Sequence, residues 1–384
     1  MKQIRVSLKE RSYDILIGRG ILRRIGSFLR RLTVGEKVMV VSNREVARHF
    51  GFLKPVRKSL AHSGFRVSDY ELPFGNERDK SEKVLSRIWR CMIRSGLDRS
   101  STLIALGGGV VGDVAGFAAS TYMRGVHFIQ VPTTLLAQVD SAIGGKTGVD
   151  LDEGKNMIGT FYQPRLVLSD VDTLGTLRPA VFQQSLAEVV KYGVIRDPAL
   201  FSLLERFGNT FLSHAANRKF GKMDFSFLEK MIERSARIKA DIVARDEKET
   251  KGERMILNYG HTFAHALEGA SRFRMSHGEA VYIGMLLAGE LGYRIGLTPA
   301  NFVKRQARLI HTLFPQIRLP HYAKHYRFAW PKLKMFLGRD KKAVAGELKF
   351  ILPAALGKVK VVTMKGRSAW RKVERVFTDF GFCF

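Results

Sequence analysis

The chain has 384 residues, of which 45% are hydrophobic, which is enough for a large buried core and more typical of two domains than of one. Disorder is therefore excluded as the main state of the chain. Lys and Arg residues number 64 against 35 Asp and Glu residues, so the formal net charge is +29 at pH 7.

Such a basic balance is common in nucleic-acid-binding proteins, because basic side chains neutralise phosphates. Here the basic residues are spread along the whole chain, without zinc-finger spacing, an aromatic-basic RNA signature or leucine heptads beside a basic region. We therefore expect a solvated basic surface that steers anionic substrates, and no specific nucleic-acid partner.

The number of cysteines and the hydropathy of the chain indicate its cellular compartment. Cys91 and Cys383 are too few and too far apart for a disulfide framework, which indicates a reducing environment. The first eight residues alternate polar and apolar like a strand and lack the apolar run of a secretory signal. The most apolar stretch, Ala280 to Ala288, is far too short to cross a bilayer. These features predict a cytoplasmic protein with no membrane partner.

Strands and helices alternate through the first half of the chain. Residues 2–8 and 13–18 predict a hairpin, and a helix begins at about Ile21. Further strands are expected at 37–41, 65–72, 102–106 and 126–131, with helices between them, one of them at about 80–94. This alternation is typical of a mostly parallel sheet. We predict an N-terminal α/β nucleotide-binding domain over residues 1–177.

From about Arg178 the periodicity becomes almost wholly helical. Amphipathic stretches occur at 183–192, 227–245, 262–269 and 279–291. We predict a second, all-α domain over residues 178–384.

The glycine-rich segment from Gly107 to Asp113 follows a predicted strand and opens a predicted helix. In that context glycines let a pyrophosphate approach backbone N–H groups at a helix N-terminus. The G-x-G-x-x-G match alone is weak, because tight strand-to-helix turns use glycine for steric reasons. The acidic residue expected about 20 positions later is missing, and Asn43 or Glu45 after an earlier strand is an alternative partner for the ribose.

Histidines gather in the helical half. His261 and His265 lie one helical turn apart, which favours a metal-binding pair. His277 precedes another apolar helix, and Glu188 lies inside an apolar helix where a buried carboxylate requires a cation. Alternatively, Glu188 pairs with Lys191 and the histidines only cap or satisfy helices. Taken together, the four residues favour a catalytic zinc site with an open position.

A set of longer motifs resembles the 3-dehydroquinate synthase family. They lie between about Pro73 and Glu290 and include the segments 107–119, 124–125, 130–141, 144–147, 154–159, 161–164 and 186–193. The family fold is a nucleotide-binding α/β domain followed by a helical metal- and substrate-binding domain, in agreement with the pattern above. So long a run of matched motifs is highly specific.

The resemblance implies a lyase that uses NAD and Zn²⁺ or Co²⁺. Its substrate is a phosphorylated sugar acid, 3-deoxy-D-arabino-heptulosonate 7-phosphate, and its products are 3-dehydroquinate and phosphate, in the shikimate pathway towards chorismate and the aromatic amino acids. Hydride is removed and later returned within the same site, so no net redox change occurs. A homodimer is also implied.

The resemblance also implies functional residues. The metal ligands are Glu188, His261 and His277, so that His265 becomes an active-site histidine. Catalytic positions are Lys146, Asn156, Lys191 and His265, and substrate-binding positions are Arg124, Asp140, Lys239, Arg254, Asn258 and Lys341. NAD contacts are Gly75, Asn76, Glu77, Arg78, Asp79, Lys80, Gly109, Val110, Val111, Gly112, Asp113, Thr133, Thr134, Lys146, Lys155, Thr173, Leu174, Gly175 and Thr176.

Alternatives are a metal-dependent polyol dehydrogenase, another sugar phosphate cyclase and a basic nucleic-acid-binding protein without catalysis. Basic residues inside the matched motifs count against the dehydrogenase, whose substrate is neutral. The chain departs from the family at Asn76, where glycine is usual, has one additional residue between Lys239 and His261, and shows little resemblance beyond about Pro353.

Overall fold

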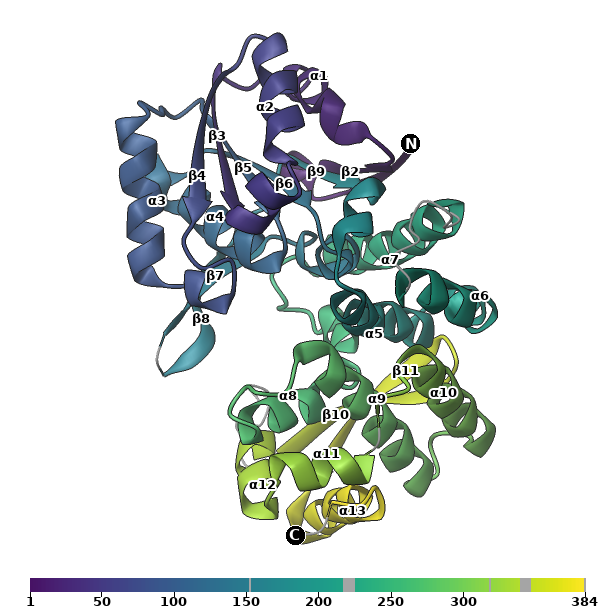
Figure 1. Ribbon diagram of the computed structural model, residues 1–384. Helices are drawn as coiled ribbons and strands as arrows, with labels where there is room; N and C mark the ends of the chain where they lie inside the picture. The colour runs from purple at the N-terminus through teal and green to yellow at the C-terminus, as the bar shows by residue number, and fades with distance from the viewer. Residues whose placement is uncertain (152, 217–224, 318, 339–346, 383–384) are drawn as a thin grey trace. The chain divides into compact units, whose positions relative to one another are not determined.

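The computed structural model describes residues 1–384 except 152, 217–224, 318, 339–346 and 383–384 (Figure 1). The chain forms two compact units, one of Met1–Leu177 with Asp224–Lys248 and one of Arg178–Met223 with Glu249–Phe384. The first break follows Leu177, where the sequence analysis places its domain boundary. Helix α7 (Phe225–Arg245) differs from that expectation, because it joins the first unit and packs against its first two strands.

A seven-stranded sheet forms the centre of the first unit. Its strand order is β1-β2-β9-β6-β5-β3-β4, and only the β1–β2 pair is antiparallel. The strands are β1 (Lys2–Val6), β2 (Tyr13–Gly18), β3 (Lys37–Asn43), β4 (Arg66–Leu72), β5 (Thr102–Gly107), β6 (His127–Pro132) and β9 (Leu166–Asp170). The opening hairpin and the mostly parallel sheet are confirmed.

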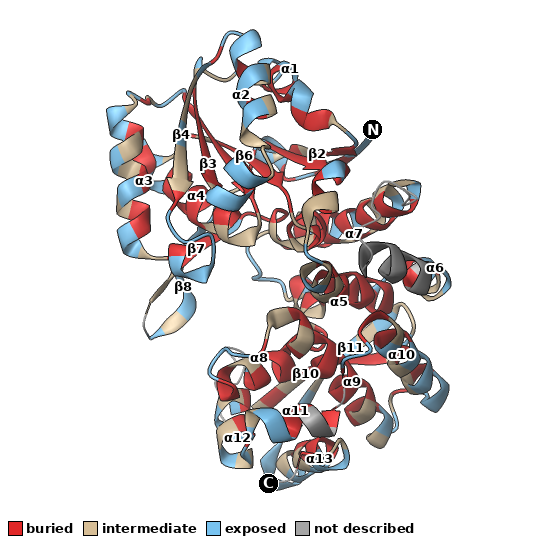
Figure 2. Ribbon diagram, in the orientation of Figure 1, coloured by how far each residue is buried: buried red, intermediate tan, exposed pale blue. Residues whose placement is uncertain are grey.

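Helices cover both faces of this sheet. Helices α1 (Ile25–Arg30) and α2 (Leu53–His62) pack over Val38, Val40 and Ile104. Helices α3 (Glu82–Arg94) and α4 (Gly109–Thr121) pack over Met39 and Leu103 on the opposite face. Successive strand residues point to opposite faces, so a central strand that is covered on both faces, such as β5, needs consecutive apolar residues. Figure 2 shows the central strands, such as β3 and β6, buried and the outer sides of α2 and α3 exposed.

A two-stranded hairpin, β7 (Lys146–Leu151) with β8 (Gly154–Phe161), packs beside α4. Short helical turns complete the first unit: η1 (Lys9–Arg11), η2 (Ile21–Arg24), η3 (Glu45–His49), η4 (Glu77–Asp79), η5 (Tyr122–Arg124), η6 (Ala137–Ser141) and η7 (Val171–Thr176). Most of these turns follow the carboxyl ends of strands, where parallel sheets carry their ligand sites.

The second unit is mainly helical, as predicted. Its helices are α5 (Pro179–Ile195), α6 (Pro198–Ala216), α8 (His261–Ala270), α9 (His277–Arg294), α10 (Ala300–Leu313), α11 (Leu319–Tyr326), α12 (Trp330–Gly338) and α13 (Gly366–Asp379), with the short η9 (Glu253–Asn258). Helix α9 is buried along most of its length and contacts α5, α8 and α10, so it forms the centre of this unit.

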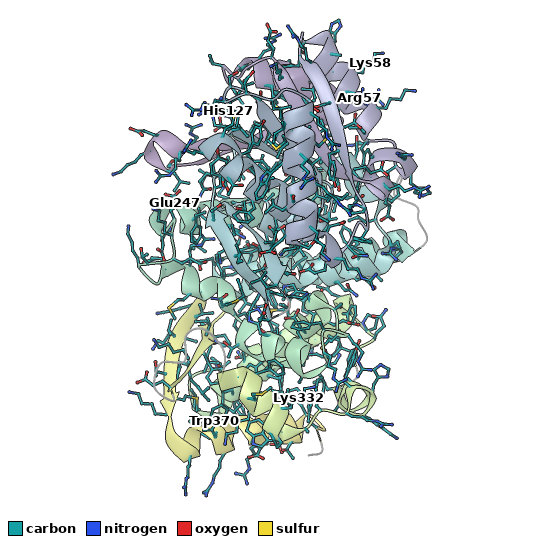
Figure 3. The ribbon with its side chains drawn as sticks, turned by 90° about the vertical axis from the view of Figure 1, so that its left-hand side faces the viewer. Arg57, Lys58, His127, Glu247, Lys332 and Trp370 are labelled. Carbon is teal, nitrogen blue, oxygen red and sulfur yellow. The ribbon has the colours of Figure 1, made fainter. Side chains whose placement is uncertain are left out.

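One antiparallel hairpin, β10 (Glu347–Ala355) with β11 (Lys358–Lys365), adds strands to a domain expected to be all-α. Strand β10 packs against α9, and Phe350 stacks on Phe263 of α8 with ring centroids 5.1 Å apart. Lys334 lies over the ring of Trp370, which is labelled in Figure 3 on α13. The expectation of an all-α domain is therefore wrong, although Lys358–Lys365 alternates between lysine and apolar residues over most of its length, as a strand with one face exposed does.

Among the described residues, no helix is both long and apolar enough to span a membrane. Cys91 is a free thiol, and Cys383 lies outside the described residues.

Candidate functional site

Three helices of the second unit bring together one carboxylate and two imidazoles. Glu188 lies in the buried half of α5, and His261 and His277 are the first residues of α8 and α9. Oε1 of Glu188 is 3.3 Å from Nε2 of His261 and 3.6 Å from Nε2 of His277. The three ligand atoms all lie within 4.8 Å of one another.

Local sequence fixes the two histidines at helix starts. Gly260, before α8, has φ +79°, and a Cβ there would lie 2.9 Å from the backbone N of Met285, so no other residue fits without strain. Before α9, Ser276 and Glu279 form a reciprocal capping box that fixes where the helix begins. The sequence H-G-E at 277–279 thus places His277 in the first turn of its helix.

Charge compensation shapes the titration of this cluster. Burial favours the neutral acid at Glu188, but Lys191 and His261 outweigh burial and hold the pKa of Glu188 well below its usual range. Burial lowers the pKa of His261, and the nearby Glu188 offsets only part of that effect. Burial also disfavours the charged form of His277, yet the nearby carboxylates of Glu188 and Glu268 raise its pKa to about 10.

The alternative expectation, an ion pair between Glu188 and Lys191, is also present in the structure. The Lys191 ammonium contacts Oε2 of Glu188, and both side chains are 2% exposed. The ring nitrogens face Oε1, so the ion pair and the histidine cluster use different oxygens of the carboxylate.

The donor atoms fit a divalent metal. Among the described residues neither oxygen of Glu188 accepts a well-aligned hydrogen bond, although both are buried. Two ligands about 2.1 Å from a tetrahedral zinc ion lie about 3.4 Å apart, close to the separations of Oε1 from the two Nε2 atoms. The nitrogens and the carboxylate therefore converge on a common point, and two imidazoles with one carboxylate suit zinc or cobalt.

The Nδ1 atom of each histidine ring, which faces away from Glu188, also has a partner, and neither partner was predicted from the sequence. Nδ1 of His261 is 3.1 Å from the carbonyl oxygen of Tyr259, and Nδ1 of His277 is 3.1 Å from Oε1 of Glu268. Glu268 is seven positions after His261, so both lie on one face of α8. That spacing is the only sequence signal that indicates Glu268.

The remaining predicted residues of the second unit lie in different surroundings. His265 is exposed, its ring centroid is 5.6 Å from that of His261, and it does not belong to the group of possible metal ligands. Arg254, on η9, is buried and pairs with Glu249 at 3.2 Å. Asn258 ends η9 and is half-buried. Lys341 lies outside the described residues.

In the first unit, Lys80 gathers predicted residues from three segments. Its ammonium donates to Oδ2 of Asp113 at 2.9 Å and contacts Oδ1 of Asn156, although the side chain is only 4% exposed. Lys155 lies 3.4 Å from Glu77. The loop after β4, the start of α4 and the β7–β8 hairpin are thereby connected.

The loop that begins at Gly75 is built around a buried acid. Asp79 accepts hydrogen bonds from the backbone N–H groups of Phe74 and Gly75, at 3.1 and 2.6 Å. Asn76 accepts from the backbone N–H of Arg78 at 3.0 Å. Asp79 therefore fixes the loop from inside, which is a structural task that the family resemblance does not indicate.

A pocket of about 650 Å³ lies at the carboxyl ends of β3 and β4. It is lined by Arg44, Glu45, Arg48, His49, Leu72, Pro73, Phe74 and Gly75. Glu45, one of the two proposed ribose partners, thus faces the same pocket as Gly75. Asn43 accepts a hydrogen bond from the backbone N–H of Val46 in η3 at 2.9 Å.

Steric demands account for much of the glycine-rich turn. A Cβ at Gly107 would lie 2.5 Å from Val111, and one at Gly112 would lie 2.8 Å from Gln130. Helix α4 starts at Gly109, and its N-cap residue, Gly108, has no side chain that could bond the first N–H groups of the helix. The turn therefore combines close packing with the N-terminus of α4, a helix of 13 residues, and Val110 lies in the first turn of that helix.

Most of the threonines predicted to contact NAD form hydrogen bonds within the protein itself. Thr173 donates to the carbonyl of Asp170 at 2.7 Å and accepts from Gln138, and Thr176 donates to the carbonyl of Thr173. Thr134 accepts a hydrogen bond from the backbone N–H of Ala137 at 3.2 Å, and Thr133 is buried. Leu174 is also buried, whereas Gly175 is half-buried.

Two of the residues predicted to bind substrate form an ion pair in the first unit. Asp140 on η6 pairs with Lys239 on α7. Arg124 is exposed on η5 with φ +69°, in the left-handed region, and Lys146 is exposed at the start of β7. Within the first unit, the Asp140–Lys239 pair and the Lys80–Asp113 pair each balance their own charges.

Sequence comparison finds one family along both units. The family described as 3-dehydroquinate synthase N-terminal matches residues 71–184, and 3-dehydroquinate synthase C-terminal matches residues 185–343. The chain is similar to the 3-dehydroquinate synthase of Gloeobacter violaceus, with 45% identity over 360 residues and 94% of each chain covered. It is 43% identical to that of Microcystis aeruginosa over 359 residues, 93% of each chain.

Solved structures with this fold include enzymes of other specificity. A 2-epi-5-epi-valiolone synthase from Streptomyces hygroscopicus, with NAD⁺ and Zn²⁺ bound, is 26% identical with a TM-score of 0.83, covering 97% of this chain and 98% of that one. A 2-deoxy-scyllo-inosose synthase complexed with carbaglucose-6-phosphate, NAD⁺ and Co²⁺ is 24% identical with a TM-score of 0.82, covering 98% and 99%. A glycerol dehydrogenase from Schizosaccharomyces pombe is 15% identical with a TM-score of 0.65, covering 95% and 89%, and shares only the fold.

Proposed function

Because the chain belongs to the 3-dehydroquinate synthase family, we propose that it converts 3-deoxy-D-arabino-heptulosonate 7-phosphate to 3-dehydroquinate and phosphate. The observation that carries the proposal is the convergence of Glu188, His261 and His277 within the part of the chain that matches the C-terminal family. The neutral-substrate dehydrogenases share only the fold, at 15% identity for the glycerol dehydrogenase.

We propose that the first unit holds NAD. Bound NAD would accept a hydride from the substrate carbon that bears a hydroxyl group and return it later in the cycle. The N-terminus of α4, at Gly109 to Asp113, offers backbone N–H groups to a pyrophosphate, and Glu45 faces the pocket beside Gly75 as an acceptor for ribose hydroxyls. Lys80 holds Asp113 and Asn156 in place.

Glu188, His261 and His277 would hold the metal, zinc or cobalt. Such an ion acts as a Lewis acid that stabilises negative charge on a substrate oxygen. Glu188 supplies the one anionic ligand of the three, and its burial keeps that charge from being solvated. The Lys191 ammonium neutralises the second oxygen of Glu188 and lies next to the cluster, where it can also serve an anionic substrate.

The substrate carries a carboxylate and a phosphate, and both need cations in a site shielded from water. We propose Lys191, Lys239, Arg254, Arg124, Lys146 and Lys341 for this purpose. Asn156 and Asn258 would orient hydroxyl groups. His265, outside the ligand group but beside His261, would move a proton or bind the phosphate end.

An assay with purified protein, NAD, Zn²⁺ or Co²⁺ and the heptulosonate phosphate tests the proposal. Phosphate and dehydroquinate should appear in equal amounts, and one equivalent of NAD per site should support many turnovers. A chelator should abolish turnover, and zinc or cobalt should restore it.

Each alternative activity has its own outcome in this assay. Sustained accumulation of NADH would support a polyol dehydrogenase instead. Turnover of other sugar phosphates to a different carbocycle, without dehydroquinate, would support another cyclase. Full turnover by metal-free protein would overturn the metal assignment.

We also propose a homodimer and a cytoplasmic location, both from the family resemblance and the sequence. Light scattering on the purified protein measures the mass of the assembly directly. A mass of one chain, 43.3 kDa, would overturn the dimer.

A further inference from the structure

Glu268 is the strongest unassigned group next to the histidine cluster. It lies on α8 with its side chain 16% exposed, and its Oε1 is 3.1 Å from Nδ1 of His277. Nε2, the other nitrogen of that ring, is the one that faces Glu188. The carboxylate of Glu268 therefore contacts the predicted ligand from the side opposite to the ligand set.

The partners of the two rings decide which nitrogen carries the proton. The carbonyl of Tyr259 can only accept a hydrogen bond, so Nδ1 of His261 must be the donor. An ionised Glu268 likewise only accepts, so Nδ1 of His277 is a donor as well. In the metal-binding form of each ring, with the proton on Nδ1, the lone pair is on Nε2, the nitrogen that faces Glu188.

The two supports differ in charge. Nδ1 of His261 contacts a neutral carbonyl, whereas Nδ1 of His277 contacts a carboxylate. The carboxylate makes Nε2 of His277 the more basic of the two ligand atoms for a metal ion. His277 also needs the support more, because its side chain is 41% exposed and that of His261 is 11% exposed. An exposed ring without such a contact would sample several orientations.

We propose that Glu268 is a positioning residue for the metal site, which fixes the orientation and tautomer of His277 through an Nδ1–H to Oε1 hydrogen bond and thereby strengthens metal binding. The inference rests on the proposed function, because it takes Glu188, His261 and His277 as the ligands. It adds a residue that none of the matched motifs assigns.

Metal binding by the full-length protein tests the inference without any activity measurement. Zn²⁺ affinity is measured by competition with a chromophoric chelator for wild type, Glu268→Gln, Glu268→Ala and the control Glu290→Gln. Glu290 is a carboxylate on α9 that pairs with Arg294. We expect Glu268→Ala to lose about 10- to 100-fold in affinity. Glu268→Gln keeps an acceptor for Nδ1–H and should lose less, and Glu290→Gln should bind as wild type.

Cobalt gives a second readout that a merely structural role would not change. With Co²⁺ at saturation, the visible absorption bands of Glu268→Ala should differ from those of wild type, because the field of His277 changes, at an unchanged melting temperature of the metal-free protein. Wild-type affinity and an unshifted spectrum in Glu268→Ala would overturn the inference. So would equal losses in the Gln and Ala variants accompanied by equal losses of melting temperature.

The same data separate this inference from the proposed function. Wild type that binds zinc tightly but forms no dehydroquinate would refute the function and leave the role of Glu268 testable. Active wild type with unaltered metal binding in both Glu268 variants would refute only the role of Glu268. Should Glu268→Ala fail to fold, Glu268→Gln decides, and an affinity equal to wild type together with an unshifted cobalt spectrum counts against the inference.

Discussion

Lys239, on α7, forms an ion pair with Asp140, on η6, within the first unit. Their side chains are only 9% and 17% exposed. The pair fastens α7 to the sheet domain and at the same time joins two residues that the family resemblance assigns to substrate binding.

Breaking this pair should cost stability. Asp140→Asn or Lys239→Met removes one charge from a mostly buried pair and should lower the free energy of unfolding by about 1–3 kcal/mol, less than for a fully buried pair. The double variant should lose less than the sum of the two single losses. Urea unfolding of the four proteins measures the coupling.

The exposed pair of Arg66 and Glu36 supplies the control for this cycle. Its side chains are 76% and 61% exposed, so Glu36→Gln should leave stability almost unchanged. Strict additivity of the Asp140 and Lys239 variants would mean that the two side chains act independently.

Glu188→Gln should weaken Zn²⁺ binding by at least about tenfold, because it removes the only anionic ligand of the proposed set. The variant should keep its helical circular dichroism, since an amide of equal size replaces the carboxylate. Chelator competition measures the affinity, with Glu290→Gln as the control. Unchanged affinity in Glu188→Gln would assign the metal to a different carboxylate.

His277→Ala and His265→Ala should have opposite effects on metal content. His277 contributes one of the three convergent ligand atoms, whereas His265 is outside that group and exposed. His277→Ala should lose bound zinc. His265→Ala should retain zinc and lose most of its turnover. Atomic absorption of dialysed protein gives the metal content. If His265→Ala lost its zinc and His277→Ala retained it, the ligand assignment would be reversed.

Glu247, labelled in Figure 3, should give the first unit a small pH dependence of stability. Hydrogen bonding from Arg11, at 3.0 and 2.7 Å, holds the pKa of Glu247 below its usual range. A depressed pKa stabilises the folded protein at pH values above the pKa of Glu247 in the unfolded chain, about 4.5. That stability is lost as the pH falls through the lower pKa of Glu247 in the folded protein.

Glu247→Gln should therefore melt slightly below wild type at pH 7, by no more than about 2 °C because Arg11 is exposed. The difference should shrink as the pH falls through the depressed pKa of Glu247. Thermal unfolding of both proteins from pH 7 to pH 3 measures it. A difference that persists undiminished at pH 3 would mean that packing, not charge, accounts for the loss.

Local patterns determined the architecture of the first unit. Strands buried on both faces need continuous apolar runs, as in Leu103 to Leu106, and their alternation with helices specifies a parallel sheet before any contact is known. The glycine-rich turn and the break after Leu177 were predicted for the same reason, since both depend on residues adjacent in sequence. The motif resemblance, in turn, indicated Glu188, His261 and His277 as a set.

Contacts between distant segments could be decided only by the tertiary structure. Helical spacing pairs His261 with His265, yet the ring of His277 arrives from the next helix and completes the group instead. An amphipathic period shows that α7 buries one face but not that the first two strands cover it. The support of His277 by Glu268 likewise depends on how α8 and α9 pack. Sequence fixes the faces that each element must bury, and packing selects which side chains from different elements meet.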